Sequence, residues 1–143
     1  MTKKKSSVIS FEGFSFQYRA QKKPTLTGIN LNIYPGEKVL IAGPSGSGKS
    51  TLAGCINGLN PFSNPGESTG KLIVDGVDAM HSSIFELSAH VGTVLQDPDG
   101  QFIGLTVGED IAFALENGCT PQDKMHEITK HAAELVGIEN HLD

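Results

Sequence analysis

The sequence predicts an α/β domain built around a strand, a glycine-rich loop and a helix, and three patterns support this fold class. Residues 29–33 alternate between apolar and polar side chains, which is typical of a half-buried strand. Residues 39–42 are uniformly apolar, as in a parallel strand that is buried on both faces. After the glycine-rich residues 43–48, apolar side chains recur at spacings of four and three from Leu52 to Leu59, which indicates a helix.

Further strands are expected on both sides of this unit. Residues 8–12 and 14–18 have the composition of extended segments, with a turn expected at Gly13. Residues 71–74 precede Asp75-Gly76, a pair typical of a tight hairpin turn. Residues 91–95 form a second candidate for a buried parallel strand, and residues 60–70, with two prolines and two glycines, are expected to be a loop.

Two helices are expected in the C-terminal third of the chain. The first covers residues 107–115. The second has Thr120 as its N-cap, Pro121 and Asp123 in its first turn, and Gly137 as its end. One apolar face of this second helix is predicted, formed by Met125, Ile128, Ala132 and Leu135.

The loop between the predicted strand and helix completes the pattern G-x-x-x-x-G-K-[ST]. Glycines let consecutive backbone N–H groups approach a polyphosphate, and the start of the following helix adds unpaired N–H groups with partial positive charge. In this pattern the lysine reaches the β- and γ-phosphates and the next hydroxyl ligates Mg²⁺. The sequence therefore predicts a site for a nucleoside triphosphate with Mg²⁺ at Gly43, Pro44, Ser45, Gly46, Ser47, Gly48, Lys49, Ser50 and Thr51.

Composition narrows the class of protein. The chain has 143 residues, of which 38% are hydrophobic and 19% charged, so we expect a folded domain. No apolar run approaches the ~20 residues of a membrane-spanning helix. The net charge of −5 argues against a surface for nucleic acid. Cys55 and Cys119 have no metal-ligand spacing and are expected to be free thiols.

Beyond the glycine-rich loop, several motifs resemble those of one family. The chain is similar to the ATP-binding subunits of ABC transporters, and among them to those of energy-coupling-factor or cobalt-type importers. The resemblance extends from about Val8 to Asp143. Its motifs lie at residues 14–18, 26–33, 36–37, 43–51, 70–76, 91–96, 97–102 and 106–113.

The resemblance implies a role for particular residues. Tyr18 matches the aromatic residue that stacks on adenine, and Thr51 matches a residue near the α-phosphate. Gln96 matches the glutamine that contacts Mg²⁺ and the attacking water, which makes Ser50 and Gln96 the expected metal-contacting residues. Residues 1–96 are then expected to form the nucleotide-binding core, and residues 97–143 the start of a helical subdomain.

The resemblance also implies the setting of the whole protein. We expect an ATP hydrolase at the cytoplasmic face of the cell membrane that couples ATP to the uptake of a metal ion or a vitamin. Its partners would be a transmembrane subunit and a second ATP-binding subunit, the same or related, with no nucleic acid. The family's signature loop and its acidic catalytic residue are expected beyond Asp143. We therefore expect an N-terminal fragment, with an incomplete nucleotide-binding domain, that does not turn ATP over alone.

Three alternatives remain open from the residues. Residues 97–100 also fit the D-x-x-G pattern of GTPases, although the guanine-reading motif is not seen. A small-molecule kinase would need several arginines around the phosphates, and the chain has only Arg19, before the loop. A non-transport ABC ATPase that acts on nucleic acid is disfavoured by the acidic composition. The sequence does not identify the transported solute.

Overall fold

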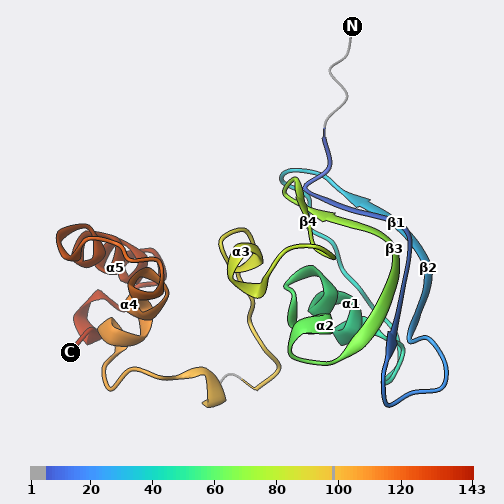
Figure 1. Ribbon diagram of the computed structural model, residues 1–143. Coiled ribbons are helices and arrows are strands. Elements are labelled where there is room, and N and C mark those ends of the chain that lie inside the picture. The colour runs from blue at the N-terminus through green and yellow to red at the C-terminus, as the bar shows by residue number, and fades with distance from the viewer. Residues whose placement is uncertain (1–5, 98) are drawn as a thin grey trace, which may run out of the picture. The chain divides into compact units, whose positions relative to one another are not determined.

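The computed structural model describes residues 6–97 and 99–143 (Figure 1). The chain divides into two compact units, of which the first ends at Thr93 and the second begins at Val94. Among the described residues, no helix combines the length and the apolar character needed to cross a membrane.

The first unit contains an antiparallel sheet. Its strands are β1 (Ile9–Tyr18), β2 (Leu26–Ile33), β3 (Gly66–Val74) and β4 (Val77–Asp78), in the spatial order β2-β1-β3-β4 (Figure 1). Every pair of neighbours in this sheet is antiparallel. The strands predicted near the N-terminus are thus present and pair antiparallel, and the predicted hairpin turn between β3 and β4 is confirmed.

The predicted break at Gly13 is a β-bulge inside one strand, which corrects the expectation of two separate segments. The register between β1 and β3 shifts between Glu12 and Ser15. Gly13 has a φ of 57°, and Gly70 on the neighbouring strand has a φ of 82°. A Cβ on Gly70 would lie 2.5 Å from the carbonyl oxygen of Gly13, so the two backbones approach closely at this point. Glycines at the bulge allow pairing to continue on both sides of it.

In the described part of the first unit, three helices accompany the sheet: α1 (Lys49–Ile56), α2 (Leu59–Phe62) and α3 (Ile84–Ser88). Figure 1 shows α1 and α2 beside one face of the sheet. The hydrophobic core joins side chains of β1, β3, α1 and α3 in one cluster. Its fully buried large side chains are Phe11, Phe14, Phe16, Leu72 and Leu87.

The helix predicted through Leu59 ends earlier. Asn57 is the C-cap of α1, and Gly58, with a φ of 79°, precedes α2. Leu59 therefore belongs to a second short helix. The loop predicted over residues 60–70 is also shorter than expected, because β3 begins at Gly66.

Two segments that were predicted as buried parallel strands are irregular. Val39, Leu40 and Ile41 are 48, 89 and 41% exposed, and Val94 is 90% exposed. Residues 39–42 and 91–95 form no ladder in the described parts of the chain. A strand that is apolar on both faces needs hydrogen-bonded neighbours and a layer on each side. Within residues 6–97 and 99–143 these two segments have no such neighbours.

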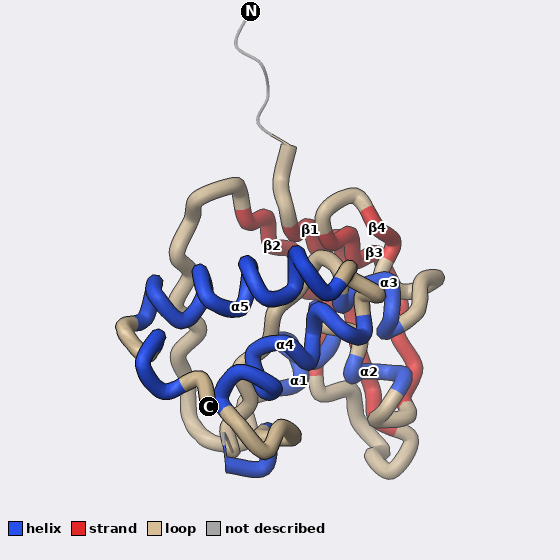
Figure 2. Tube along the Cα trace, turned by 90° about the vertical axis from the view of Figure 1, so that its left-hand side faces the viewer, coloured by secondary structure: helices blue, strands red, loops and turns tan. Residues whose placement is uncertain are grey.

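The second unit is helical. It contains the 3₁₀ turn η1 (Asp99–Gln101), α4 (Val107–Asn117), α5 (Gln122–Val136) and the 3₁₀ turn η2 (Glu139–His141). Helices α4 and α5 lie side by side (Figure 2). The prediction of two helices is confirmed, with Gly137 in a left-handed conformation (φ 75°) at the end of α5. The predicted N-cap Thr120 is wrong by one residue, because Pro121 occupies that position without a side-chain cap.

The buried stripe of α5 differs from the predicted apolar face. Thr129 and Ala133 are buried and Met125 is half-buried, at a spacing of four. Ile128 and Leu135, which were expected inside, are 43 and 73% exposed. The stripe of α5 that packs in this unit therefore consists of Met125, Thr129 and Ala133. Side chains four residues apart form a ridge along a helix, and such ridges pack into the grooves of a neighbouring helix.

Candidate functional site

The phosphate loop (residues 43–51) leads directly into α1. The N-cap of α1 is Gly48, with a φ of 92°, and no side chain caps the helix. The first turn contains no acidic residue. The N–H groups at this end are thus free of a competing side-chain carboxylate, and the helix dipole favours an anion there. Position 48 requires glycine for two reasons. Its φ lies in the left-handed region, and a Cβ there would lie 3.0 Å from the side chain of Leu26.

The Lys49 side chain folds back over the loop. Its Nζ donates hydrogen bonds to the carbonyl oxygens of Gly43 (2.9 Å) and Pro44 (2.8 Å). The backbone N–H of Ser47 donates to the Pro44 oxygen at 3.3 Å, which closes a turn. Ser50 is exposed. A single ammonium group is therefore held at the loop by two neutral carbonyl acceptors, and negatively charged phosphate oxygens, which are stronger acceptors, can replace them.

Tyr18 and Thr51, from β1 and α1, meet beside the loop. The Tyr18 hydroxyl lies 3.0 Å from the Thr51 Oγ1, and either hydroxyl can be the donor. The Tyr18 ring makes an edge contact with Phe16, with ring centroids 4.9 Å apart. Thr51 is buried. Two of the residues predicted for the nucleotide site are thus brought into direct contact, although they are 33 positions apart.

A buried amide completes this contact. Asn60 donates from its Nδ2 to the Tyr18 hydroxyl (3.3 Å) and to the backbone carbonyl of Thr51 (3.1 Å). Its Oδ1 accepts from the Nδ2 of Asn64 at 2.9 Å. Asn60 is only 4% exposed, and these three bonds satisfy its side-chain nitrogen and oxygen inside the protein.

The thiol of Cys55 lies next to this network. Burial raises the pKa of Cys55 to about 11, and a hydrogen bond with Asn60 opposes part of that increase. Cys55 and Cys119 are both free, as predicted, and Cys119 is exposed. Cys55 is therefore a protonated core residue at neutral pH, without the thiolate character of a nucleophile.

Gln96 lies in the second unit, on an exposed bend. Its role at a metal ion stays a prediction. Nearby, the Gln101 side chain accepts from the Leu95 N–H at 3.3 Å and donates to the Asp97 carbonyl oxygen at 3.0 Å. Pro98, which belongs to the motif at residues 97–102, lies outside the described residues.

The segment 102–105, which we call the apolar loop, follows this turn and exposes large side chains. Phe102, Ile103 and Leu105 are 69, 62 and 96% exposed. Two carboxylates of α4 hold its backbone. Asp110 accepts from the N–H groups of Ile103 (2.8 Å) and Gly104 (3.1 Å), and Glu109 accepts from those of Leu105 (2.8 Å) and Thr106 (3.2 Å).

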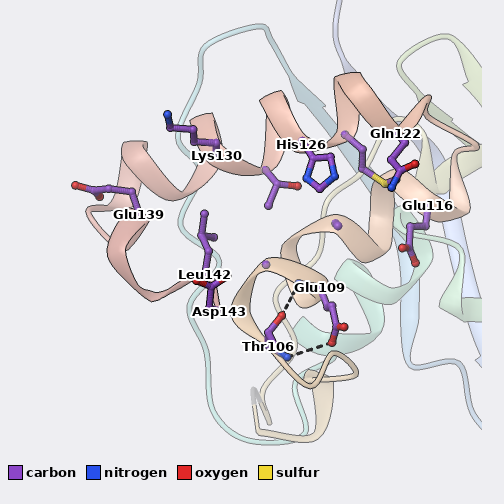
Figure 3. A pocket seen from close by; sticks show the side chains of 13 residues that line it. Thr106, Glu109, Glu116, Gln122, His126, Lys130, Glu139, Leu142 and Asp143 are labelled. Atoms are coloured by element: carbon purple, nitrogen blue, oxygen red, sulfur yellow. Dashed lines mark hydrogen bonds between the residues drawn. The ribbon is translucent and has the colours of Figure 1, made fainter.

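Glu109 and Thr106 also form a capping box at the start of α4. The Thr106 Oγ1 accepts from the Glu109 N–H at 3.2 Å, and the Glu109 carboxylate accepts from the Thr106 N–H (Figure 3). The apolar loop is thereby fixed to the first turn of α4. Loops that expose apolar side chains in a defined conformation are typical of contact surfaces.

A cavity of about 540 Å³ lies within the second unit, lined by α4, α5 and the last residues of the chain (Figure 3). Its lining includes Glu116 from α4 and His126 and Lys130 from α5. The buried Thr129 Oγ1 has no hydrogen-bond partner among the described residues. No residue of the phosphate loop lines this cavity. We therefore do not assign it as the nucleotide site, although it is large.

Sequence reasoning missed Asn60 and the two carboxylates of α4. Asn60 stands between an apolar residue and a proline, and no local pattern distinguishes it from other loop asparagines. Glu109 could have been found, because T-x-x-E before an apolar helical pattern is the signature of a capping box. The backbone contacts of Asp110 have no such signature.

Comparison with known proteins identifies the relatives of this chain. A protein of Clostridium perfringens named as an ABC transporter ATP-binding protein is 58% identical over 139 residues, which are 97% of this chain and 24% of the relative. A similarly named protein of Bacillus thuringiensis is 60% identical over 131 residues, 92% of this chain and 23% of the relative. The chain thus spans about a quarter of the length of these curated relatives.

Solved structures show the same fold. The structure of CbiO1 from Clostridium perfringens, part of the ABC transporter complex CbiONQ, matches with a TM-score of 0.78 and 31% identity. That match covers 96% of this chain and 53% of CbiO1. A bacterial Atm1-family ABC exporter with ATP bound matches with a TM-score of 0.59 and 29% identity, over 79% of this chain and 18% of the exporter.

The match to CbiO1 confirms the predicted fold class, an incomplete α/β nucleotide-binding domain of the ABC type. The irregular segment before the phosphate loop is the part that departs from the predicted strand. The family model described as "ABC transporter" matches residues 26–143, which include the phosphate loop and both helices of the second unit. The chain therefore belongs to the ABC transporter family.

Proposed function

We propose that this chain is the nucleotide-binding part of an ABC transporter ATPase of the energy-coupling-factor type, which drives import. The observation that carries the proposal is the phosphate loop at the start of α1, where the helix end has neither a side-chain cap nor an acidic residue. The likeness to CbiO1, part of the complex CbiONQ, supports the energy-coupling-factor type. The solute is proposed only by class, a metal ion or a vitamin.

ATP with Mg²⁺ fits the residues present. The N–H groups of the loop and of the first turn of α1 would surround the phosphates, and Lys49 would exchange its two carbonyl partners for phosphate oxygens. The exposed Ser50 hydroxyl would contact the metal ion. We further propose Gln96 as a second metal-contacting residue and Tyr18 as the ring that stacks on adenine. Bound Mg²⁺ would neutralise charge on the phosphates during hydrolysis.

We also propose two partners for this chain. A transmembrane subunit and a second ATP-binding domain, identical or related, would complete the transporter at the cytoplasmic face of the membrane. The surface that we propose for the transmembrane subunit is the segment from Asp97 to Leu115, because it contains the exposed apolar loop that Glu109 and Asp110 hold in place.

The test of the nucleotide site is Lys49→Ala in the full-length protein. We expect a ~10- to 150-fold loss of Mg·ATP affinity by titration calorimetry, because a charge-assisted phosphate contact is worth roughly 1.5–3 kcal/mol. Lys124→Ala, on the exposed face of α5, is the matched control and should bind as wild type. Unchanged ATP affinity in Lys49→Ala would show that this loop is not the site.

The same titration separates the alternatives. GTP that binds tenfold more tightly than ATP would favour a GTPase, which the residues 97–100 left open. Binding of duplex DNA at low salt would favour a nucleic-acid ATPase of the same family. We expect neither, and we expect ATP hydrolysis to require the full-length protein.

A further inference from the structure

We propose that Asn60 is a positioning residue of the nucleotide site, whose amide holds the Tyr18 ring at a set place beside the first turn of α1. This inference rests on the proposed function, because it assigns to Tyr18 the adenine-stacking role. It goes beyond that function in naming a residue outside the phosphate loop that controls how the base is recognised.

The contacts of Asn60 join three elements. The residue lies in α2, and its Nδ2 bonds the Tyr18 hydroxyl of β1 and the Thr51 carbonyl oxygen of α1. Tyr18 and Thr51 in turn bond each other through their hydroxyls. These bonds form a closed set, in which moving any one of the three residues breaks two contacts. Closed sets of buried hydrogen bonds are rigid, because water cannot replace a lost partner.

Burial makes this network unusual in the molecule. Among the described residues, the buried polar side chains are Thr51, Asn60 and Thr129, and two of these three belong to the network. Thr129 lies in the second unit and has no partner for its hydroxyl. Among the described residues of the first unit, both of the buried polar residues therefore lie at the contact between the phosphate-loop helix and the predicted adenine-stacking residue.

The Tyr18 ring is held at two points. Phe16, which is 1% exposed, meets it edge-on, and the Asn60–Thr51 pair fixes its hydroxyl. An aromatic ring that is immobilised before a ligand arrives loses less entropy on binding. The distance between the ring and the phosphate loop is then set by the protein, and a ligand must have a base and phosphates with the matching separation.

Gly54 supports the same interpretation. It lies in the interior of α1, where glycine is about 1 kcal/mol less favourable than alanine. A Cβ at this position would lie 2.6 Å from the Asn60 Nδ2. The helix therefore keeps a poor helix former where an alanine would push the Asn60 amide away from Tyr18 and Thr51. The lower helix propensity of Gly54 is thus the cost of leaving space for the Asn60 amide.

The experiment compares two ligands in the full-length protein: Mg·ATP, which has a base, and inorganic tripolyphosphate, which has none. Asn60→Leu keeps the shape of the side chain and removes its polar atoms. We expect ATP affinity to fall roughly tenfold, since the two bonds that tie Asn60 to Tyr18 and Thr51 are lost, while tripolyphosphate affinity stays within about twofold. Tyr18→Phe removes only the hydroxyl and should give the same selective loss.

Two further variants sharpen the comparison. Gly54→Ala should also lower ATP affinity selectively, although it raises helix propensity. Tyr34→Phe changes the other tyrosine of the chain, which is 36% exposed, and should leave both affinities unchanged. Asn60→Leu combined with Tyr18→Phe should lose less than the sum of the two single losses, because both changes remove the same bond.

Each outcome decides between a positioning role and another one. Equal loss of ATP and tripolyphosphate affinity in Asn60→Leu, or a lower melting temperature with an unchanged affinity ratio in Tyr18→Phe, would assign the network to stability alone and overturn the inference. Failure of the proposed function is a different result: wild-type protein would then bind neither ligand, or Lys49→Ala would bind both normally.

Discussion

In this protein, the reactivity and hydrogen bonding of a side chain depend on its burial as much as on its residue type. Cys55 and Cys119 are both free thiols, but only Cys55 is inside the core. The same holds for polar side chains, since Asn60 bonds three protein partners while most of the other asparagines face solvent. Environment therefore decides which of two identical side chains acts in a network.

The two thiols should differ in reactivity. The pKa of Cys55 is raised to about 11 from an ordinary value of 9.0, so little thiolate is present at pH 8. We expect iodoacetamide to modify Cys119 at least ~100-fold faster than Cys55, as measured by peptide mass spectrometry over time. Equal rates would mean that Cys55 is accessible and ionised.

The raised pKa of Cys55 also predicts a pH dependence of folding. The unfolded thiol ionises near pH 9.0 and the folded one near 11, so the folded state binds the proton more tightly. Stability from this group is complete below pH 9 and is lost as the pH rises towards 11. A Cys55→Ala variant should lack that part of the alkaline loss.

At the level of elements, side chains at the start of α4 determine the shape of the apolar loop. The N–H groups of Ile103 and Gly104 hold the pKa of Asp110 below its ordinary value of 3.8. Because the pKa of Asp110 is lower in the folded protein, the ionised carboxylate stabilises the folded loop at pH values above 3.8. This contribution disappears as the pH falls through the lower pKa of the folded state.

Asp110→Ala should therefore loosen the apolar loop and leave α4 formed. We expect the amides of Ile103 and Gly104 to exchange with deuterium at least ~10-fold faster, because two hydrogen bonds to one carboxylate are lost. Asp123→Ala, in the first turn of α5, is the matched control and should not change them. Unchanged exchange at both amides in Asp110→Ala would mean that the carboxylate does not restrain this loop.

At the scale of the whole molecule, the proposed contact with a transmembrane subunit should be detectable by cross-linking. A photoreactive amino acid at Phe102 or Leu105 of the full-length protein should capture an integral membrane protein that is encoded with the transporter and identified by mass spectrometry. The side chain of Leu105 is 96% exposed, so a substitution there should not disturb the core.

Leu135 provides the control for this experiment. It is 73% exposed on α5, outside the proposed contact segment. The same probe at Leu135 should not give the product. If neither Phe102 nor Leu105 captured a membrane subunit in the assembled transporter, the segment from Asp97 to Leu115 would not be the contact surface.

Features that depend on neighbours in the sequence were predictable. The phosphate loop, the Asp75-Gly76 turn, α4 and the glycine at the end of α5 follow from local backbone preferences and spacing. The loop also contains its own chemistry, because its ammonium, hydroxyl and N–H groups lie within nine consecutive residues. For this reason the candidate nucleotide site could be recognised from the sequence alone.

Features that depend on distant residues were not predictable. The Asn60 network joins residues up to 42 positions apart, and the buried stripe of α5 is chosen by its packing in the second unit. Residues 39–42 have the composition of a buried strand, yet they form none among the described residues. Strand pairing, side-chain burial and buried hydrogen bonds are made by groups that only the folded chain brings together, and so only the tertiary structure decided them.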